Sequence, residues 1–217
     1  MKIIVRLALI IMILLVAISC NQIVSLKGSG NIISEDRRLT HFNSIKVLGS
    51  IDININYSDD YGCTVVGDDN LIPYIKTEVV NNNLKISITR GYSISKGLMV
   101  NVYALDYDKI SILGSGDINI TDFNNINLSL NIDGSGDITG NGEVQTLSAI
   151  INGSGNIMFR DLQSISTTIT INGSGDAKIW VSESISANIN GSGKIEYYGN
   201  PMKIESKVNG SGEISSN

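Results

Sequence analysis

The sequence predicts an all-β chain that folds as a parallel β-solenoid, with rungs of about 20 residues stacked on one another. A tripeptide, Gly-Ser-Gly, recurs at a nearly constant interval, and apolar residues recur at fixed positions around it. The interval leaves no room for a helix and its connections, so an alternating β-α-β arrangement is excluded. The six regular copies start at Gly114, Gly134, Gly153, Gly173, Gly191 and Gly210.

Two columns of apolar residues flank the tripeptide, separated by polar Asn, Ser and Thr. This alternation is typical of strands that turn one face towards a core. A short strand and turn cannot bury its apolar face alone, so we expect the rungs to stack. Two residues before the first glycine stand Leu26, Val47, Ile112, Ile132, Ile151, Ile171, Ile189 and Val208. Four residues after it stand Ile32, Ile53, Ile118, Ile138, Ile157, Ala177, Ile195 and Ile214.

The tripeptide itself is expected at a corner of each rung, as a structural turn. Its glycines would adopt positive φ or let the backbone of the neighbouring rung approach closely. A degenerate copy at Gly49 has Ile51 in place of the second glycine. Asp133 and four asparagines precede the later copies and predict a side-chain ladder along the solenoid. The asparagines are Asn152, Asn172, Asn190 and Asn209.

Residues 57–108 interrupt the period and are either irregular, diverged rungs or an insertion. Two stretches, 84–88 and 98–103, still alternate like strands, whereas 68–70 and 81–83 are typical of turns. The only helical turn that we expect lies near residues 71–74.

The N-terminus predicts export and lipidation. Residues 1–19 form a lipoprotein signal peptide with a positive start, an apolar run and an ending that resembles the lipobox before Cys20. Cys20 would carry the lipid, 20–27 would be the lipidated linker and 28–217 the solenoid domain. Each buried acyl CH₂ contributes about 0.8 kcal/mol to membrane anchoring. We therefore expect an outer-membrane lipoprotein of the cell envelope, facing the periplasm or the surface.

The charge of the chain bears on its binding partners, and its cysteine content bears on disulfide formation. Removal of the signal peptide leaves an acidic chain, since Lys2 and Arg6 lie within it. Such a chain lacks the basic clusters that nucleic acids require, so no nucleic-acid partner is expected. With Cys20 consumed by lipid, Cys63 stands alone and no intrachain disulfide can form.

Three blocks carry a resemblance to a known family: residues 28–32 with 42–47, residues 69–75, and the later copies of Gly-Ser-Gly followed by Asp-Ile. Together they resemble the "putative auto-transporter adhesin, head GIN domain" family of Bacteroidota envelope lipoproteins, over nearly all of 28–217. The resemblance implies a right-handed parallel β-helix in the cell envelope, and no catalytic site. Ile51 departs from the repeat and leaves this interpretation intact.

Several polar residues could carry chemistry, but structural roles fit them better. A polar column after the tripeptide could bind Ca²⁺ through carboxylates, but it mixes charge signs and lacks the glycine-aspartate repeat of calcium β-rolls. No metal and no cofactor are therefore expected. A catalytic role for the single histidine, His41, is disfavoured against a loop cap, and one histidine cannot supply a catalytic triad. The column comprises Asp117, Asp137, Asn156, Asp176, Lys194 and Glu213.

Candidate ligand-binding residues are the tyrosines of the irregular segment, above all Tyr57, Tyr61 and Tyr92. Exposed rings of this kind could stack on sugars or on a protein partner, whereas packing in strands is the structural alternative. Cys63 fits a buried cysteine better than a reactive thiol.

These observations favour a non-enzymatic, lipid-anchored binding or structural module, with an adhesin-like role as its most specific form. Its partners would be the membrane, through the N-terminal lipid, and a glycan or an envelope protein. A β-helix enzyme acting on polysaccharides and an envelope stress sensor or scaffold are the alternatives. No polar capping repeat follows Gly212, so self-association through an open C-terminal rung is also expected.

Overall fold

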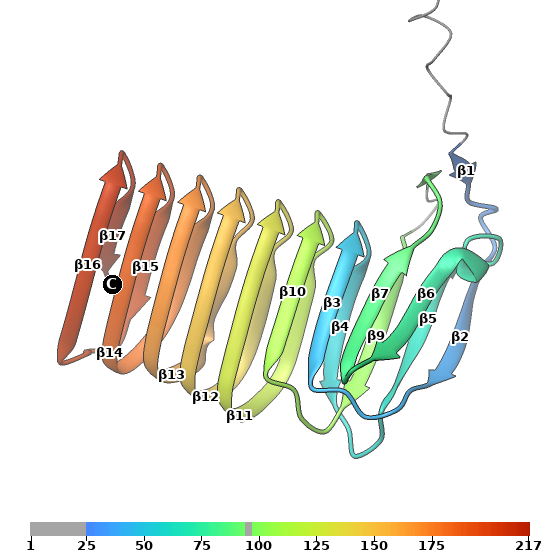
Figure 1. Ribbon diagram of the computed structural model, residues 1–217, viewed down its shortest axis with the longest axis horizontal. Coiled ribbons are helices and arrows are strands. Elements are labelled where there is room, and N and C mark those ends of the chain that lie inside the picture. Colours follow the sequence, from blue (N-terminus) through green and yellow to red (C-terminus); the bar gives the residue numbers. More distant parts are fainter. Residues whose placement is uncertain (1–24, 94–96) are drawn as a thin grey trace, which may run out of the picture.

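The computed structural model describes residues 25–93 and 97–217, which form a β-solenoid of about 5 turns (Figure 1). Each regular rung runs along one face, turns at Gly-Ser-Gly and returns along the other face. At the second corner, β11 to β14 bend without a break in the strand. The strands of the regular part are β10 (Lys109–Gly114), β11 (Ile118–Gly134), β12 (Ile138–Gly153), β13 (Ile157–Gly173), β14 (Asp176–Gly191), β15 (Lys194–Tyr198), β16 (Lys203–Gly210) and β17 (Glu213–Ser216).

The two predicted apolar columns are confirmed from the second copy onwards. Neighbouring strands pair in parallel, so that Ile132, for example, lies between Ile112 and Ile151, and Ile138 lies between Ile118 and Ile157. All of these side chains are at most 1% exposed to solvent. The core is thus a stack of β-branched side chains from both faces.

The first copy is where the column prediction is wrong. Leu26, in β1 (Leu26–Lys27), pairs with Tyr92 in β8 (Tyr92–Ser93), outside the main sheet. Ile32, in β2 (Ile32–Arg38), pairs antiparallel with Asp68 and is 37% exposed. The Gly-Ser-Gly at Gly28 therefore belongs to a loop rather than to a rung corner.

The interrupted segment contains one parallel rung. β7 (Asn83–Ile88) pairs with β3 (Ser44–Gly49), and β9 (Met99–Ala104) pairs with β4 (Asp52–Tyr57). This register places Ile86 beside Val47 and Val100 beside Ile53, so both apolar columns continue through it. A diverged rung from later in the sequence is therefore stacked on the outer side of an earlier one.

The rest of that segment covers the N-terminal end of the solenoid. β5 (Gly62–Asp68) pairs antiparallel with both β9 and β2, and β6 (Ile75–Val80) pairs antiparallel with β7. The expected helical turn is confirmed as η1 (Ile72–Tyr74), a short 3₁₀ helix between β5 and β6. Reversal of strand direction ends the parallel stack at this end.

Both glycines of the corner tripeptide are required, because neither has room for a side chain and the first also has positive φ. The first has positive φ in every regular copy, for example +140° at Gly153. The second, such as Gly155, has no room for a side chain, because a Cβ there would lie 2.2 Å from the carbonyl oxygen of Gly136. Ile51 is tolerated, and fully buried, because the chain beyond β7 leaves the stack at this corner and pairs with β1.

Two polar ladders run beside the corners. In the predicted asparagine ladder, each side-chain amide donates to the residue one rung earlier, beginning with Asn152 to Asp133 at 2.7 Å and continuing at 2.8 Å up to Asn209. In the second ladder, side-chain oxygens accept main-chain N–H groups of the next rung. Asp137, for example, accepts from the N–H of Asn156 at 2.8 Å. The hydrogen bonds of the second ladder satisfy backbone N–H groups that the corner leaves without strand partners.

The loop at Gly28 is clasped by the turn after β5. Asp68 is fully buried and accepts the N–H of Gly30 at 2.7 Å, while Asn70 accepts the N–H of Ser29 at 3.0 Å. A Cβ on Gly28 would lie 2.2 Å from a carboxylate oxygen of Asp68. The clasp fixes the described N-terminal strand to the covered end of the solenoid.

Gly28→Ala is expected to open this clasp while the rungs stay folded, because the new methyl group displaces the Asp68 carboxylate. Hydrogen exchange should show faster exchange at Ser29 and Gly30 and unchanged protection in β11 to β14. Gly30→Ala is the comparison variant, because it strains the backbone at a φ of +85° without a methyl group meeting Asp68, and so separates backbone strain from displacement of the carboxylate. Equal protection at Ser29 in the Gly28→Ala variant and the unmodified protein would contradict the clasp.

No helix among residues 25–93 and 97–217 is both long and apolar enough to cross a membrane. The predicted signal peptide at 1–19 and the predicted lipidation site, Cys20, lie outside the described residues.

Candidate functional site

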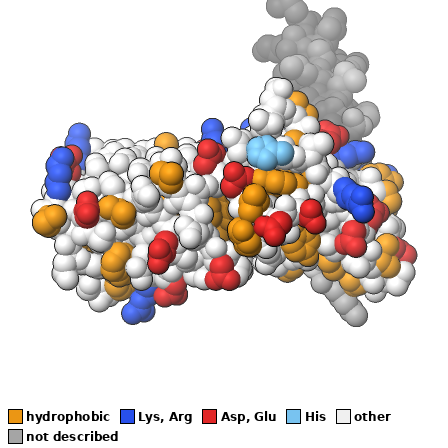
Figure 2. All heavy atoms as spheres, turned by 90° about the horizontal axis from the view of Figure 1, so that it is seen from below, with side chains coloured by type: hydrophobic (Ala, Val, Ile, Leu, Met, Phe, Trp, Pro, Cys, Tyr) orange, Lys and Arg blue, Asp and Glu red, His pale blue; other side chains and the backbone are white. Residues whose placement is uncertain are grey.

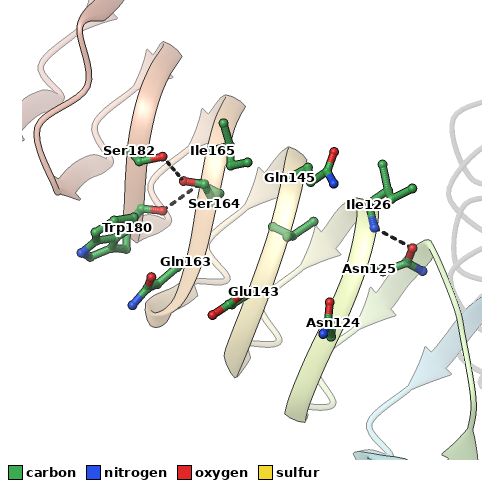
Figure 3. Close-up of a pocket in the computed structure, with 11 residues that line it drawn as sticks. Asn124, Asn125, Ile126, Glu143, Gln145, Gln163, Ser164, Ile165, Trp180 and Ser182 are labelled. Atoms are coloured by element: carbon green, nitrogen blue, oxygen red, sulfur yellow. Dashed lines mark hydrogen bonds between the residues drawn. The ribbon is translucent and has the colours of Figure 1, made fainter.

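A groove follows the second corners of the solenoid, opposite the Gly-Ser-Gly edge. It has a volume of about 710 Å³ and crosses β11, β12, β13 and β14 (Figure 3). We call it the corner groove. Its lining residues are Asn124, Asn125, Ile126, Glu143, Val144, Gln145, Gln163, Ser164, Ile165, Trp180 and Ser182.

Two rows of side chains border the corner groove, one residue from each rung. In the polar row, Asn124 pairs with Glu143, Glu143 with Gln163, and Gln163 with Trp180. In the other row, the flanking strand pairs bring Ile126, Gln145 and Ile165 into line, and both isoleucines are exposed. Figure 3 shows the two rows on opposite sides of the strands' midline. The groove therefore offers a repeating polar edge beside a partly apolar one.

Trp180 closes the polar row with an aromatic cluster. Its strand position lies beside Tyr198 of β15, and the guanidinium carbon of Arg160 lies 5.0 Å from the centre of the Tyr198 ring. The main-chain oxygen of Trp180 accepts a hydrogen bond of 2.7 Å from Ser164, whose hydroxyl also contacts Thr167 at 2.7 Å. These buried hydroxyls hold the bend of β13 against β14. The half-buried indole is thereby placed at one end of the groove.

A second, smaller hollow shares Asn124 and Asn125 with the corner groove and carries it on to Tyr57 at the end of β4. Tyr57 is 63% exposed, and Leu105 beside it is also exposed. From β4 to β14 there are four strand steps, which at about 4.8 Å each span roughly 19 Å. Figure 2 looks onto this edge of the molecule, where apolar and acidic side chains interrupt a largely uncharged surface.

The three tyrosines singled out from the sequence do not share one site. Tyr57 lies in the hollow beside the corner groove, whereas Tyr61 lines a separate hollow next to β2 and β5. Tyr92 donates a hydrogen bond of 3.1 Å to the main-chain oxygen of Ser50, at the Gly-Ser-Gly edge. Of the three, only Tyr57 adjoins the corner groove.

Tyr61 has contacts of a structural kind. Its ring packs edge-on against Phe42, with centres 5.2 Å apart, and against His41 at 4.9 Å. Its hydroxyl donates to Asp106. Burial, followed by this hydrogen bond and the charge of Asp106, raises the pKa of Tyr61 from 10.0 to about 12.

This raised pKa predicts an alkaline loss of stability. The folded protein keeps the Tyr61 proton that the unfolded chain loses, so the contribution is complete below pH 10.0 and declines as the pH rises towards about 12. Asp106→Asn should lower the pKa of Tyr61 towards 10.0, as followed by NMR of the ring. Asp59→Asn is the control, because Asp59 contacts Tyr57 instead. An unchanged Tyr61 titration in Asp106→Asn would refute the assignment.

The other residues considered for chemistry are His41, Cys63 and the polar column after Gly-Ser-Gly. His41 lies 3.6 Å from Asp106 in an exposed pair, and Cys63 is buried, which raises the pKa of its thiol. In the column after Gly-Ser-Gly, carboxylates such as those of Asp117 and Asp137 accept hydrogen bonds from main-chain N–H groups of the next rung. In the described part of the chain, no three His, Cys, Asp or Glu side chains are grouped to hold a metal ion.

The corner groove was not predicted from the sequence. The sequence does contain a pattern that indicates the groove, because the residues of the polar row recur at nearly the same interval as Gly-Ser-Gly. The register shifts between β13 and β14 break this interval before Trp180, which therefore falls outside the regular spacing.

Comparison with known proteins gives a family and a set of similar structures. The family model described as "putative auto-transporter adhesin, head GIN domain" matches residues 41–201. A crystal structure of a putative adhesin from Bacteroides fragilis is 24% identical, with a TM-score of 0.71 over 89% of this chain and 100% of that one. No curated protein matches the sequence.

Two further crystal structures share the fold. A putative adhesin from Parabacteroides merdae is 19% identical with a TM-score of 0.58, and a putative lipid binding protein from Parabacteroides distasonis is 23% identical with a TM-score of 0.55. Each covers 89% of this chain, which covers 99% of each. With the family model matching most of its length, the chain belongs to the putative auto-transporter adhesin, head GIN domain family.

Proposed function

We propose that this protein is a lipid-anchored, non-catalytic binding module of the cell envelope, with an adhesin-like role, and that the corner groove binds a glycan chain. The observation that carries the proposal is the polar row from Asn124 to Trp180, which repeats once per rung along an open groove. A ligand with its own repeat fits such a row better than a compact small molecule does.

The chemistry of the row suits sugars. Asn124 and Gln163 carry amides that both donate and accept hydrogen bonds, and Glu143 accepts them, which matches the hydroxyl groups of a sugar. Trp180 offers an apolar ring face for the C–H face of a sugar ring. No Lys or Arg lines the corner groove, so a phosphate-rich ligand has no charge partner there.

Binding is favoured over hydrolysis by the count of carboxylates. Most glycosidases use a pair of carboxylic acids on either side of the bond that they cleave. Glu143 is the one carboxylate among the residues that line the corner groove. The alternative of a polysaccharide-active enzyme would require new reducing ends to appear when the protein is incubated with a glycan that it binds.

The test is a glycan screen with the full-length lipoprotein in detergent and two matched variants. Trp180→Ala should weaken saturable binding about tenfold, a loss of about 1.4 kcal/mol. Tyr92→Ala is the control, because Tyr92 lies at the opposite edge and also has an aromatic ring. Equal loss in both variants, or no binding to any glycan, would contradict the proposal.

Tyr57 is proposed to contact the far end of longer chains, since its hollow continues the groove. Tyr57→Ala should therefore weaken binding of long oligosaccharides and leave short ones unaffected. Titrations with both lengths decide this, and an equal effect on both would remove Tyr57 from the site.

An envelope scaffold or sensor is the second candidate, favoured by the exposed Ile126 and Ile165 beside the polar row. Apolar side chains at the centre of an exposed surface are typical of protein interfaces. Photo-crosslinking from position 165 in cells would distinguish the two functions. Capture of one envelope protein, without glycan binding, would replace the glycan proposal.

A further inference from the structure

The two ends of the solenoid differ in how their strand edges are treated. At the N-terminal end, β5 and β6 run antiparallel to the rungs that they pair with, β2 runs antiparallel to β5, and the three strands cover the parallel stack (Figure 1). At the other end, β16 pairs with β14 along one edge, and no described strand lies on its outer edge. A free strand edge of this length is a template for pairing with another chain.

The core is also open at β16. Ile204 and Val208 continue the inward columns of Ile185 and Ile189, which are buried by the rung above them. Ile204 is nevertheless 49% exposed and Val208 40% exposed. The β16 end therefore presents unpaired backbone together with apolar side chains from the core.

We propose that β16 pairs antiparallel with β16 of a second copy of this chain, with the two-fold axis passing through Ser206. This register places Ile204 opposite Val208 and Glu205 opposite Lys207, twice each by symmetry. Apolar positions then meet apolar ones and each carboxylate meets an ammonium group. Opposite charges on facing positions stabilise antiparallel strand pairs, and a self-complementary patch is the requirement of a two-fold interface.

Neighbouring registers lack this match. With the axis at Glu205, that carboxylate faces its own copy and Lys203 faces Lys207. With the axis at Lys207, two ammonium groups face each other. The Lys203–Glu205 ion pair of 3.0 Å within one chain is solvent-exposed and leaves Glu205 accessible. With the axis at Ile204, Lys203 would face Glu205, but only residues 203–205 of β16 would pair. Among the registers that pair most of β16, charge complementarity thus favours the axis at Ser206.

This dimer goes beyond the proposed function and does not depend on the groove binding a glycan. Each copy would carry its own corner groove, which ends at Ser182 on β14, the strand next to β16. Where a ligand or surface spans both grooves, two linked sites bind more tightly than one.

Charge reversal tests the register. Light scattering after gel filtration of the full-length protein in detergent should show a dimer, and Glu205→Lys or Lys207→Glu should each weaken it on the order of tenfold. The double reversal restores dimerisation. A mixture of the two single variants should form a heterodimer, because the two ammonium groups of one chain then face the two carboxylates of the other.

A disulfide test locates the axis. Ser206→Cys should cross-link two copies under mild oxidation, because the residue faces itself in this register. Ser186→Cys, one rung further in on β14, is the matched control and should not cross-link. A monomer at all concentrations, a dimer unaffected by either charge reversal, or equal cross-linking at both positions would overturn the proposal.

Discussion

Gly153→Ala is expected to lower the free energy of unfolding by about 2 to 6 kcal/mol, because a methyl group at this corner meets two obstacles at once. The residue has a φ of +140°, which L-amino acids with a side chain rarely adopt. A Cβ at this position would also lie 2.2 Å from the carbonyl oxygen of Gly134. Neither the corner nor the rung below it can relax without breaking strand pairs.

Gly49→Ala separates the two causes. Gly49 holds the same place in its copy and has a φ of +100°, but its nearest neighbour is a methyl group of Ile88 at 3.9 Å. Gly49→Ala should therefore lower the free energy of unfolding only through the strain of its positive φ, by about 1–3 kcal/mol. Urea unfolding followed by circular dichroism measures both variants. Equal destabilisation would show that close stacking of the corners is not what requires glycine.

Phe159→Ala should cost about 3–5 kcal/mol, because it removes a fully buried ring from the centre of the solenoid. The ring occupies space that Gly140, one rung earlier, leaves open. A Cβ on Gly140 would lie 3.2 Å from the edge of the Phe159 ring and 3.0 Å from Cβ of Ile120. The small and the large residue thus fill one layer of the core together.

A double-mutant cycle with Gly140→Val tests this pairing. Alone, the valine overpacks the layer and should cost about 1–3 kcal/mol. Together with Phe159→Ala, it fills the cavity, so the double variant should be more stable than the sum of the single losses predicts. Additive losses would mean that the two residues do not share space.

Much of the fold could be predicted because one repeat controls it. The spacing of the Gly-Ser-Gly copies equals the length of a rung. The β-branched residues around Ile132 and Ile138 indicate which positions face the core. The corner glycines could be predicted as a group, since the same backbone approach recurs at every rung. Gly155 and its equivalents lack Cβ for the same steric reason.

Other features depend on pairing that no local pattern records. The rung formed by β7 and β9 is inserted on the outer side of an earlier rung, against sequence order. Leu26 and Ile32 match the columns in spacing but lie in β1 and β2, on either side of the loop that Asp68 binds. Trp180 reaches the corner groove through register shifts in β13. The candidate site was accordingly missed, although its rows follow the repeat.

Binding of an extended glycan in the corner groove should depend on the length of the glycan. The most direct measurement is a calorimetric titration of the full-length protein with oligosaccharides of increasing length, drawn from a glycan that binds in the screen. Affinity should rise with length until the span from Trp180 to Tyr57 is filled, and Trp180→Ala should remove the gain. Affinity that does not depend on length, or that survives Trp180→Ala unchanged, would rule out binding of an extended glycan along the corner groove.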